Sequence, residues 1–155
     1  MRNYRIEVNT NILISIQEEE ISISQLYDFC LEPDCGAVVV FSGTVRSFSE
    51  GRLNVTSLVY EAYTELAIKM LSEIAERVFE LYQGVRKIAI VHRLGLLSLC
   101  ESSVVVAVSS EHREEAFQGA RFAIDTLKAR APIWKKETWS GGEDWSENAS
   151  TIVDL

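Results

Sequence analysis

The sequence predicts one domain of mixed class, an α+β fold or an α/β sandwich, in which two amphipathic helices pack on one sheet. Two apolar runs, Ala37–Phe41 and Val104–Val108, have the length of buried strands. Two longer segments repeat apolar side chains at helical spacing. The 155 residues, 47% of them hydrophobic and 25% charged, have an ordinary globular composition and are enough for one core. The predicted order of elements is roughly ββ-α-ββ-α-ββ-α-β.

The N-terminal segment predicts a hairpin and then a short helix. Arg5–Val8 and Ile12–Ile16 are strand candidates on either side of the polar residues 9–11. We expect Ser24 to cap a helix that runs to about Leu31 and is closed by Pro33.

The middle of the chain predicts two strands and the first long helix. Gly36–Arg46 contains the first apolar run, and Leu53–Tyr60 alternates more weakly. We expect Thr64 to cap the helix, with Glu65 in its first turn and Gly84 after its end. The apolar stripe of this helix consists of Ala67, Met70, Leu71, Ile74, Val78 and Leu81.

The C-terminal half predicts further strands around a second long helix. Val85–His92 and Val104–Ser109 are strand candidates. We expect Ser110 to cap the helix and Pro132 to stop it, because proline cannot continue a helix. Ile133–Trp139 is then a short strand, and the polar tail from about residue 140 is predicted to be a loop.

The charge of the chain argues against several partners. Fifteen Lys and Arg stand against 23 Asp and Glu, which gives a net charge of −8 and an isoelectric point of about 4.8. A general nucleic-acid binder needs a basic footprint, so any anionic ligand must be held by a local basic patch. No apolar run approaches the roughly 20 residues of a membrane span, and no signal-peptide core follows Met1, so we expect a cytoplasmic protein.

Metal and cofactor sites have no support in the sequence. The three cysteines, Cys30, Cys35 and Cys100, form no CxxC pair, and the two histidines are too few for a histidine-rich site. No phosphate-cradling glycine loop is present. We therefore expect no metal and no cofactor.

A basic segment lies at the end of the second long helix and in the strand that follows. Lys128 lies at the edge of the apolar stripe of this helix. Arg113 lies near the middle of that stripe, close to the start of the helix. Charges at such positions either snorkel to water or line a pocket. Five basic residues stand here against the single acidic Asp125, a local excess of four positive charges: Arg121, Lys128, Arg130, Lys135 and Lys136.

The strand after Pro132 divides its side chains between two faces. Period-two alternation predicts Ile133, Lys135, Glu137 and Trp139 on one face, with Trp134 and Lys136 on the other. Lys135 and Glu137 then line one surface, with Lys128 nearby if the chain reverses at the proline. Such a surface either binds an anion or holds a lysine of lowered pKa.

Two further cationic positions are candidates for the same site. His112 and Arg113 begin the second long helix, where an N-terminus with basic side chains favours an anion, although His112 is equally explained as an ordinary first-turn residue. Arg46 follows the first apolar strand, and strand ends often supply sites, although most such arginines only face solvent.

Several motifs together resemble the large, catalytic subunit of molybdopterin synthase. The resemblance covers about Gly36 to Trp145, and its most specific part is the Lys-x-Arg-Ala-Pro-x-Trp-Lys block. The matching segments are Phe41–Arg46, His92–Gly95, Ser110–Arg113 with Ala116-Phe117, and Leu127–Glu137. The resemblance implies an α/β hammerhead-type fold of the α+β class with a small additional β-rich lobe, as a single domain over residues 1–155.

The family's activity, as this resemblance implies it, is sulfur transfer. A small ubiquitin-like carrier subunit inserts its C-terminal Gly-Gly thiocarboxylate into a pocket of the catalytic subunit. Sulfur is transferred to cyclic pyranopterin monophosphate and forms the dithiolene of molybdopterin, in molybdenum cofactor biosynthesis. The expected assembly is a homodimer at the centre of a heterotetramer, with no nucleic acid and no membrane.

The resemblance also implies roles for individual residues. Lys128 and Lys135 correspond to catalytic lysines that stabilise an anionic tetrahedral intermediate or act as general acid and base. Many family members have Lys at the position of Thr44. The implied substrate-binding set is Thr44, Val45, Arg46, His112, Arg113, Lys128, Lys135, Lys136 and Glu137.

Three other functions compete with this one. The basic segment can simply dock the acidic tail of a partner, which makes the chain a non-catalytic scaffold or binding module. Lys128 or Lys135 can form a Schiff base with a carbonyl substrate. Cys100 can carry sulfur as a persulfide, although no base is near it in the sequence.

Overall fold

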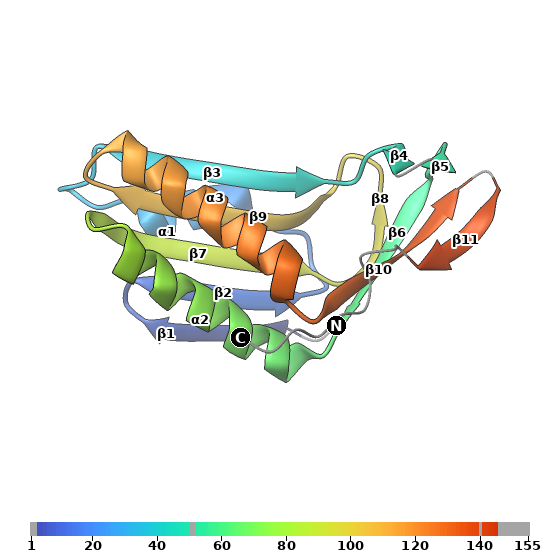
Figure 1. The fold of residues 1–155 in the computed structure, drawn as a ribbon, viewed down its shortest axis with the longest axis horizontal. Helices are drawn as coiled ribbons and strands as arrows, with labels where there is room; N and C mark the ends of the chain where they lie inside the picture. The colour runs from blue at the N-terminus through green and yellow to red at the C-terminus, as the bar shows by residue number, and fades with distance from the viewer. Residues whose placement is uncertain (1–2, 50–51, 140, 146–155) are drawn as a thin grey trace.

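The larger layer of the molecule is a five-stranded mixed sheet (Figure 1). The computed structural model describes residues 3–49, 52–139 and 141–145. Strands β2 and β7 run parallel, and the other neighbours are antiparallel. The order across the sheet is β1 (Asn3–Asn9), β2 (Ile12–Gln17), β7 (Val85–Arg93), β9 (Ser102–Ser110) and β3 (Ala37–Thr44).

Helices cover both faces of this sheet. Helix α2 (Thr64–Leu81) and helix α3 (Arg113–Arg130) lie side by side on one face, and α1 (Ile23–Cys30) lies on the other (Figure 1). The main core forms between α2, α3 and the sheet, where Leu71, Ile90 and Val106 are fully buried. The expectation of two amphipathic helices on one sheet is confirmed.

A second, smaller β layer stands at one end of the large sheet, on the right in Figure 1. Its four antiparallel strands have the order β11 (Gly142–Trp145), β10 (Ile133–Trp139), β6 (Ser57–Ala62) and β8 (Gly95–Ser98). A two-stranded pair, β4 (Phe48–Ser49) and β5 (Arg52–Leu53), adjoins it. The α+β class with an additional β-rich lobe is thereby confirmed.

All three expected helix caps are wrong. Ser22, not Ser24, caps α1, because the Gln25 N–H donates to the Ser22 hydroxyl at 3.4 Å. Ser110 is still in strand β9, where it pairs with β3 and β7, so α3 begins three residues later. His112 occupies the N-cap position of α3 and makes no side-chain capping bond.

The first long helix also starts one residue earlier than expected. Tyr63 is the N-cap of α2, and Thr64 is its first helical residue. The extended backbone of Tyr63 explains the shift, because its N–H pairs with the carbonyl of Pro132 at 3.1 Å and continues the pairing of β6 with β10.

The small lobe contains strands that the sequence did not predict. The expected strand at 53–60 lies at Ser57–Ala62, and β4, β5 and β8 were missed because each has only two to four residues. The tail from residue 140 is not all loop, since β11 pairs with β10 through Lys136 and Trp145. Residues 140 and 146–155 of that tail lie outside the described residues.

No helix in the described part of the chain is both long and apolar enough to cross a lipid bilayer.

Candidate active site

A cavity of about 300 Å³ opens where the large sheet, α3 and the small lobe meet. That volume is at the lower end of the range for small-molecule sites. Residues from β3, β6, β7, β9, α3 and β10 contribute to its wall. The lining residues are Gly43, Thr44, Arg46, Phe48, Val55, Leu58, Tyr60, His92, Ser103, Val104, Leu127, Lys128, Ile133, Trp134, Lys135 and Glu137.

Lys128 and Lys135 reach the cavity from two adjacent elements. Lys128 is exposed in the last turn of α3, and Lys135 lies in β10 with 31% of its side chain exposed. Between them the chain turns at Pro132, which has no N–H to continue the helix. The Ile133 N–H donates to the Ala131 carbonyl at 2.7 Å and closes this turn. The short connection thus brings both ammonium groups to the same cavity.

Glu137 is a buried carboxylate beside one of these lysines. Its side chain is 1% exposed, and its Oε1 lies 3.4 Å from the Nζ of Lys135. A buried charge is costly unless it is paired, so this contact favours one position of the Lys135 ammonium. The predicted shared face of Lys135 and Glu137 is confirmed.

Arg46 and Thr44 form the opposite rim of the cavity. Both are exposed, and the Arg46 guanidinium lies over the Phe48 ring at 4.7 Å from its centroid. Stacking on an aromatic face restricts the guanidinium while leaving its N–H groups in the plane available. Arg46, Lys128 and Lys135 therefore concentrate three cations around one cavity in a chain of net charge −8.

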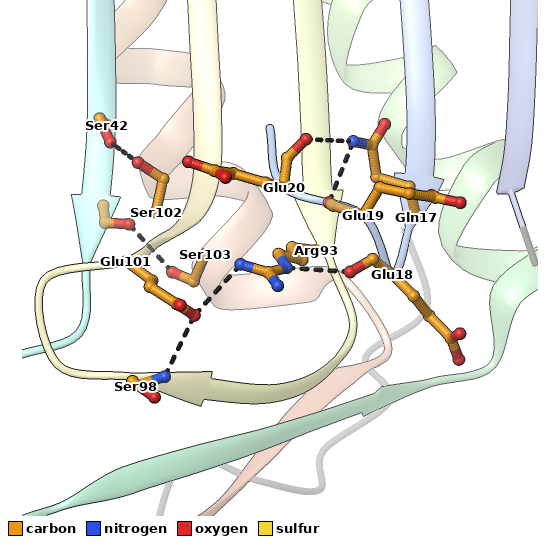
Figure 2. Close-up of polar contacts among 11 residues, drawn as sticks. Gln17, Glu18, Glu19, Glu20, Ser42, Arg93, Ser98, Glu101, Ser102 and Ser103 are labelled. Carbon is orange, nitrogen blue, oxygen red and sulfur yellow. Dashed lines mark hydrogen bonds and ion pairs between the residues drawn. The ribbon is translucent and has the colours of Figure 1, made fainter. Parts of the chain in front are cut away.

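Paired serines anchor the β3 side of this rim to β9. The hydroxyls of Ser42 and Ser102 lie 2.8 Å apart (Figure 2), and the Ser103 hydroxyl donates to the Gly43 carbonyl at 3.1 Å. The strand register shifts between Gly43 and Thr44. These bonds hold the irregular strand end from which Thr44 enters the cavity wall.

Val45 does not line the cavity, and its implied substrate-binding role stays a prediction. Its side chain is 3% exposed and packs against Val55, Leu58 and Leu97 in the core of the small lobe. Its N–H donates to the carbonyl of residue 101 at 3.0 Å, and its carbonyl accepts the N–H of residue 100 at 2.8 Å. Both backbone groups are thus already used.

Lys136 points away from the cavity, as the alternation of the strand predicts. It forms an ion pair with Glu143 of β11 at 2.8 Å and does not line the cavity. Its implied place in the substrate-binding set is therefore not supported by the geometry of this chain.

His112 and Arg113 lie at the far end of α3 from Lys128. The helix has 18 residues, and a rise of about 1.5 Å per residue separates its ends by about 27 Å. Both side chains are exposed, so Arg113 reaches water at the helix end, which is the snorkelling alternative, and does not line the cavity. One copy of the chain does not bring these two residues to the cavity.

Two aromatic side chains of the cavity wall had no predicted role. His92 of β7 is 3% exposed and contacts Tyr60 of β6 edge-on, with ring centroids 5.0 Å apart. Tyr60 is the direct cross-strand neighbour of Lys135. Burial lowers the pKa of His92 to about 4, so its ring is neutral near pH 7. The only sequence signal for His92 was its presence in a matching motif.

Cysteine and metal chemistry have no counterpart at the cavity. Cys100 is exposed in the turn before β9 and does not line the cavity. Burial raises the pKa of the Cys30 thiol to about 12, which keeps it protonated. Within residues 3–49, 52–139 and 141–145, no cluster of three or more His, Cys, Asp or Glu side chains is arranged to hold a metal ion.

Comparison with known proteins identifies the family. The family model described as "MoaE protein" matches residues 16–130. The chain belongs to the MoaE family. Its cavity is formed largely by matched residues, and β10, which carries Lys135 and Glu137, directly follows the matched segment.

Curated relatives of this MoaE chain share one name. This chain is 41% identical over 135 residues to a molybdopterin synthase catalytic subunit of Taeniopygia guttata, and the match covers 87% of this chain and 86% of the relative. It is 43% identical over 130 residues to that of Staphylococcus carnosus, covering 84% and 85%. The chain spans only 38% of the longer Drosophila melanogaster relative, at 41% identity over 141 residues.

Solved structures show the same fold. Molybdopterin synthase from Staphylococcus aureus superposes with a TM-score of 0.80 at 37% identity, covering 90% of this chain and 98% of that one. A complex of subunits 1 and 2 of molybdopterin-converting factor from Helicobacter pylori has a TM-score of 0.70 at 22% identity, covering 86% and 90%, and supports the fold alone.

Proposed function

We propose that this chain is the catalytic subunit of a molybdopterin synthase and acts as a sulfurtransferase in the cytoplasm. It transfers sulfur from the C-terminal thiocarboxylate of a small carrier subunit to cyclic pyranopterin monophosphate and so forms the dithiolene. The observation that carries the proposal is the meeting of Arg46, Lys128 and Lys135 at one cavity of about 300 Å³. Membership of the MoaE family and the name molybdopterin synthase catalytic subunit of its relatives also support the proposal.

The rim of the cavity suits the anionic part of the substrate. Arg46 and Lys128 are exposed, and charge-assisted hydrogen bonds from such groups hold phosphate oxygens. Thr44 offers a hydroxyl at the same rim. These three residues therefore form the proposed phosphate site.

Lys135 is the proposed catalytic group. Once the thiocarboxylate sulfur has bonded to the pterin, its release from the carrier requires water to attack the acyl carbon. This attack breaks the carbon–sulfur bond and leaves a carboxylate on the carrier, and the tetrahedral intermediate carries a negative oxygen. A positioned ammonium stabilises such an oxyanion. Lys135 is the lysine with a fixed partner, since Glu137 lies 3.4 Å from it. The same ammonium can hold the carboxylate that remains on the carrier.

The proposed assembly places two copies of the chain at the centre of a heterotetramer. The curated relatives are named catalytic subunits, and this supports a second, different subunit as partner. His112 and Arg113 are exposed, and Arg113 lies about 22 Å along α3 from Lys128 at the cavity, which leaves them accessible to a second copy. We propose that they enter the substrate site of that copy.

Reconstitution with a thiocarboxylated carrier tests this function. We expect Lys135→Ala to lower kcat at least 100-fold, and Lys128→Ala to raise KM for the pyranopterin at least tenfold. Lys69→Ala, an exposed α2 lysine outside the cavity, is the matched control and should leave turnover unchanged. Unchanged turnover in both cavity variants would falsify the assignment.

A further inference from the structure

His92 is a buried polar group in the cavity wall to which the proposed reaction assigns no role. It lies in β7, between β2 and β9, and faces the cavity with only 3% of its surface exposed. A buried imidazole normally has partners for both ring nitrogens. One of its nitrogens has such a partner within the chain.

The bonded nitrogen fixes the tautomer of the ring. His92 Nδ1 lies 2.9 Å from the carbonyl oxygen of Arg93. A carbonyl can only accept, so Nδ1 carries the hydrogen and donates it. In a neutral imidazole Nε2 then has a lone pair. Nothing in the described part of the chain donates a hydrogen bond to Nε2.

Burial keeps this ring neutral. It lowers the pKa of His92 to about 4, because the apolar surroundings disfavour the imidazolium. The hydrogen bond to the Arg93 carbonyl acts in the opposite direction but is the smaller effect. Nε2 is therefore an acceptor under ordinary conditions.

A hydrogen-bond network anchors the side chain of Arg93, the residue whose carbonyl sets this tautomer. Figure 2 shows the Arg93 guanidinium between Glu101 and the backbone of Glu18. Its Nε donates to the Glu18 carbonyl at 2.9 Å and its Nη1 to Glu101 at 3.1 Å. The same carboxylate accepts the Ser98 N–H at 3.1 Å. The backbone beside His92 is thus anchored on both sides.

The cavity consequently has two chemically different parts. Its rim carries the exposed cations Arg46 and Lys128, and its wall contains the buried acceptor of His92. A phosphorylated pterin has matching parts, since its phosphate is an anion and its fused rings carry N–H donors. Tyr60 lies beside the histidine and supplies an aromatic surface next to such rings.

We propose that Nε2 of His92 accepts a hydrogen bond from a ring N–H of the bound pyranopterin and so orients the rings while the rim holds the phosphate. This inference rests on the proposed function for the identity of the ligand. It adds a binding residue, His92, whose tautomer is set by the backbone carbonyl of Arg93.

Two substitutions test the roles of the two ring nitrogens of His92 separately. His92→Asn keeps an amide N–H near the position of Nδ1, which can still donate to the Arg93 carbonyl, but has no atom at Nε2. His92→Gln places an amide oxygen near the position of Nε2 and has nothing at Nδ1. The two variants therefore differ in the acceptor that faces the cavity.

The measurement is equilibrium binding of cyclic pyranopterin monophosphate to the chain assembled with its carrier subunit. We expect His92→Asn to weaken binding about tenfold, the usual effect of one lost hydrogen bond, and His92→Gln to recover most of it. Binding of inorganic phosphate alone should be equal in all three proteins, because the rim is unchanged. Melting temperatures of the variants report any loss of fold.

Each outcome has a distinct meaning. Equal pyranopterin affinity of the wild type and His92→Asn overturns the role of His92 and leaves the proposed function standing. Equal weakening in both variants, in step with their melting temperatures, assigns His92 a structural role only and also overturns the inference. Absence of pyranopterin binding by the wild type contradicts the proposed function and this inference with it.

Discussion

The carboxylate of Glu137 lies 3.4 Å from the ammonium of Lys135, and Glu137 is 1% exposed. The two residues are two positions apart on β10 and share the face that lines the cavity. A buried carboxylate at this position limits where the Lys135 ammonium can lie. In the proposed reaction, this contact positions the catalytic lysine.

The first prediction concerns that contact. Glu137→Gln removes the charge at nearly constant shape, so the lysine loses its fixed partner. We expect kcat to fall about tenfold to 100-fold, the scale of effect that misplacing a catalytic group produces. Steady-state turnover of the reconstituted enzyme, measured with the melting temperature, checks this.

A matched control is Glu143 of the neighbouring strand β11, which pairs with Lys136 on the other face of β10. Glu143→Gln breaks the Lys136–Glu143 ion pair, which is partly exposed and outside the cavity. An exposed pair contributes about 0–1 kcal/mol, so stability and turnover should both be nearly unchanged. If Glu143→Gln and Glu137→Gln lower kcat equally, the positioning role of Glu137 is wrong.

The second prediction is a pH dependence of stability caused by His92. The folded ring stays neutral down to about pH 4, whereas the unfolded ring binds a proton near its ordinary value of 6.5. Between these values the unfolded state takes up the extra proton, so acid favours unfolding. The expected loss from this one group between pH 7 and pH 4 is about 3 kcal/mol.

A non-titrating variant isolates this effect from the carboxylates that titrate in the same range. Chemical unfolding of the wild type and of His92→Gln is measured from pH 7 to pH 4. The difference between their free energies of unfolding should shift by about 3 kcal/mol in favour of the variant as the pH falls. A difference that does not change with pH means that His92 is not held neutral by burial.

The third prediction concerns the end of β3. A Cβ on Gly43 would lie 2.9 Å from Cγ1 of Val104, so Gly43→Ala must displace the strand that carries Thr44 into the cavity wall. We expect a loss of about 1–3 kcal/mol in stability, as for overpacking elsewhere, and a higher KM for the pyranopterin.

Gly119→Ala is the comparison for that substitution. Its Cβ would lie 3.1 Å from Val78, inside the main core and away from the cavity. It should leave KM unchanged, whatever the balance between the contact with Val78 and the helix propensity gained by alanine. Equal KM values for the two variants would show that the close contact between Gly43 and Val104 does not shape the site.

The parts of the site that sequence reasoning located are those fixed by local geometry. Strand alternation placed Lys135 and Glu137 on one face, and Pro132 predicted the reversal that brings Lys128 close. Both relations span fewer than ten residues. Of the five basic residues in this segment, Lys128 and Lys135 line the cavity, whereas the other three do not.

The parts that sequence reasoning misplaced depend on distant strands. Val45 is buried because the register shift after Gly43 directs it into the small lobe, whose core comes from segments far along the chain. Ser110 does not cap α3 because pairing with Ala37 and Val85 keeps it in β9. His92 faces the cavity only because β6 packs across that end of the large sheet.

The central claim is that the cavity of Lys128 and Lys135 is where sulfur passes from the carrier to the pterin. Mass spectrometry of both reactants after a single turnover tests it most directly. The wild type should leave the carrier with a carboxylate in place of its thiocarboxylate, and the pterin should gain the sulfur that the carrier loses. With Lys135→Ala both masses should stay unchanged while the carrier still binds. Transfer of sulfur by Lys135→Ala at the wild-type rate would contradict the account.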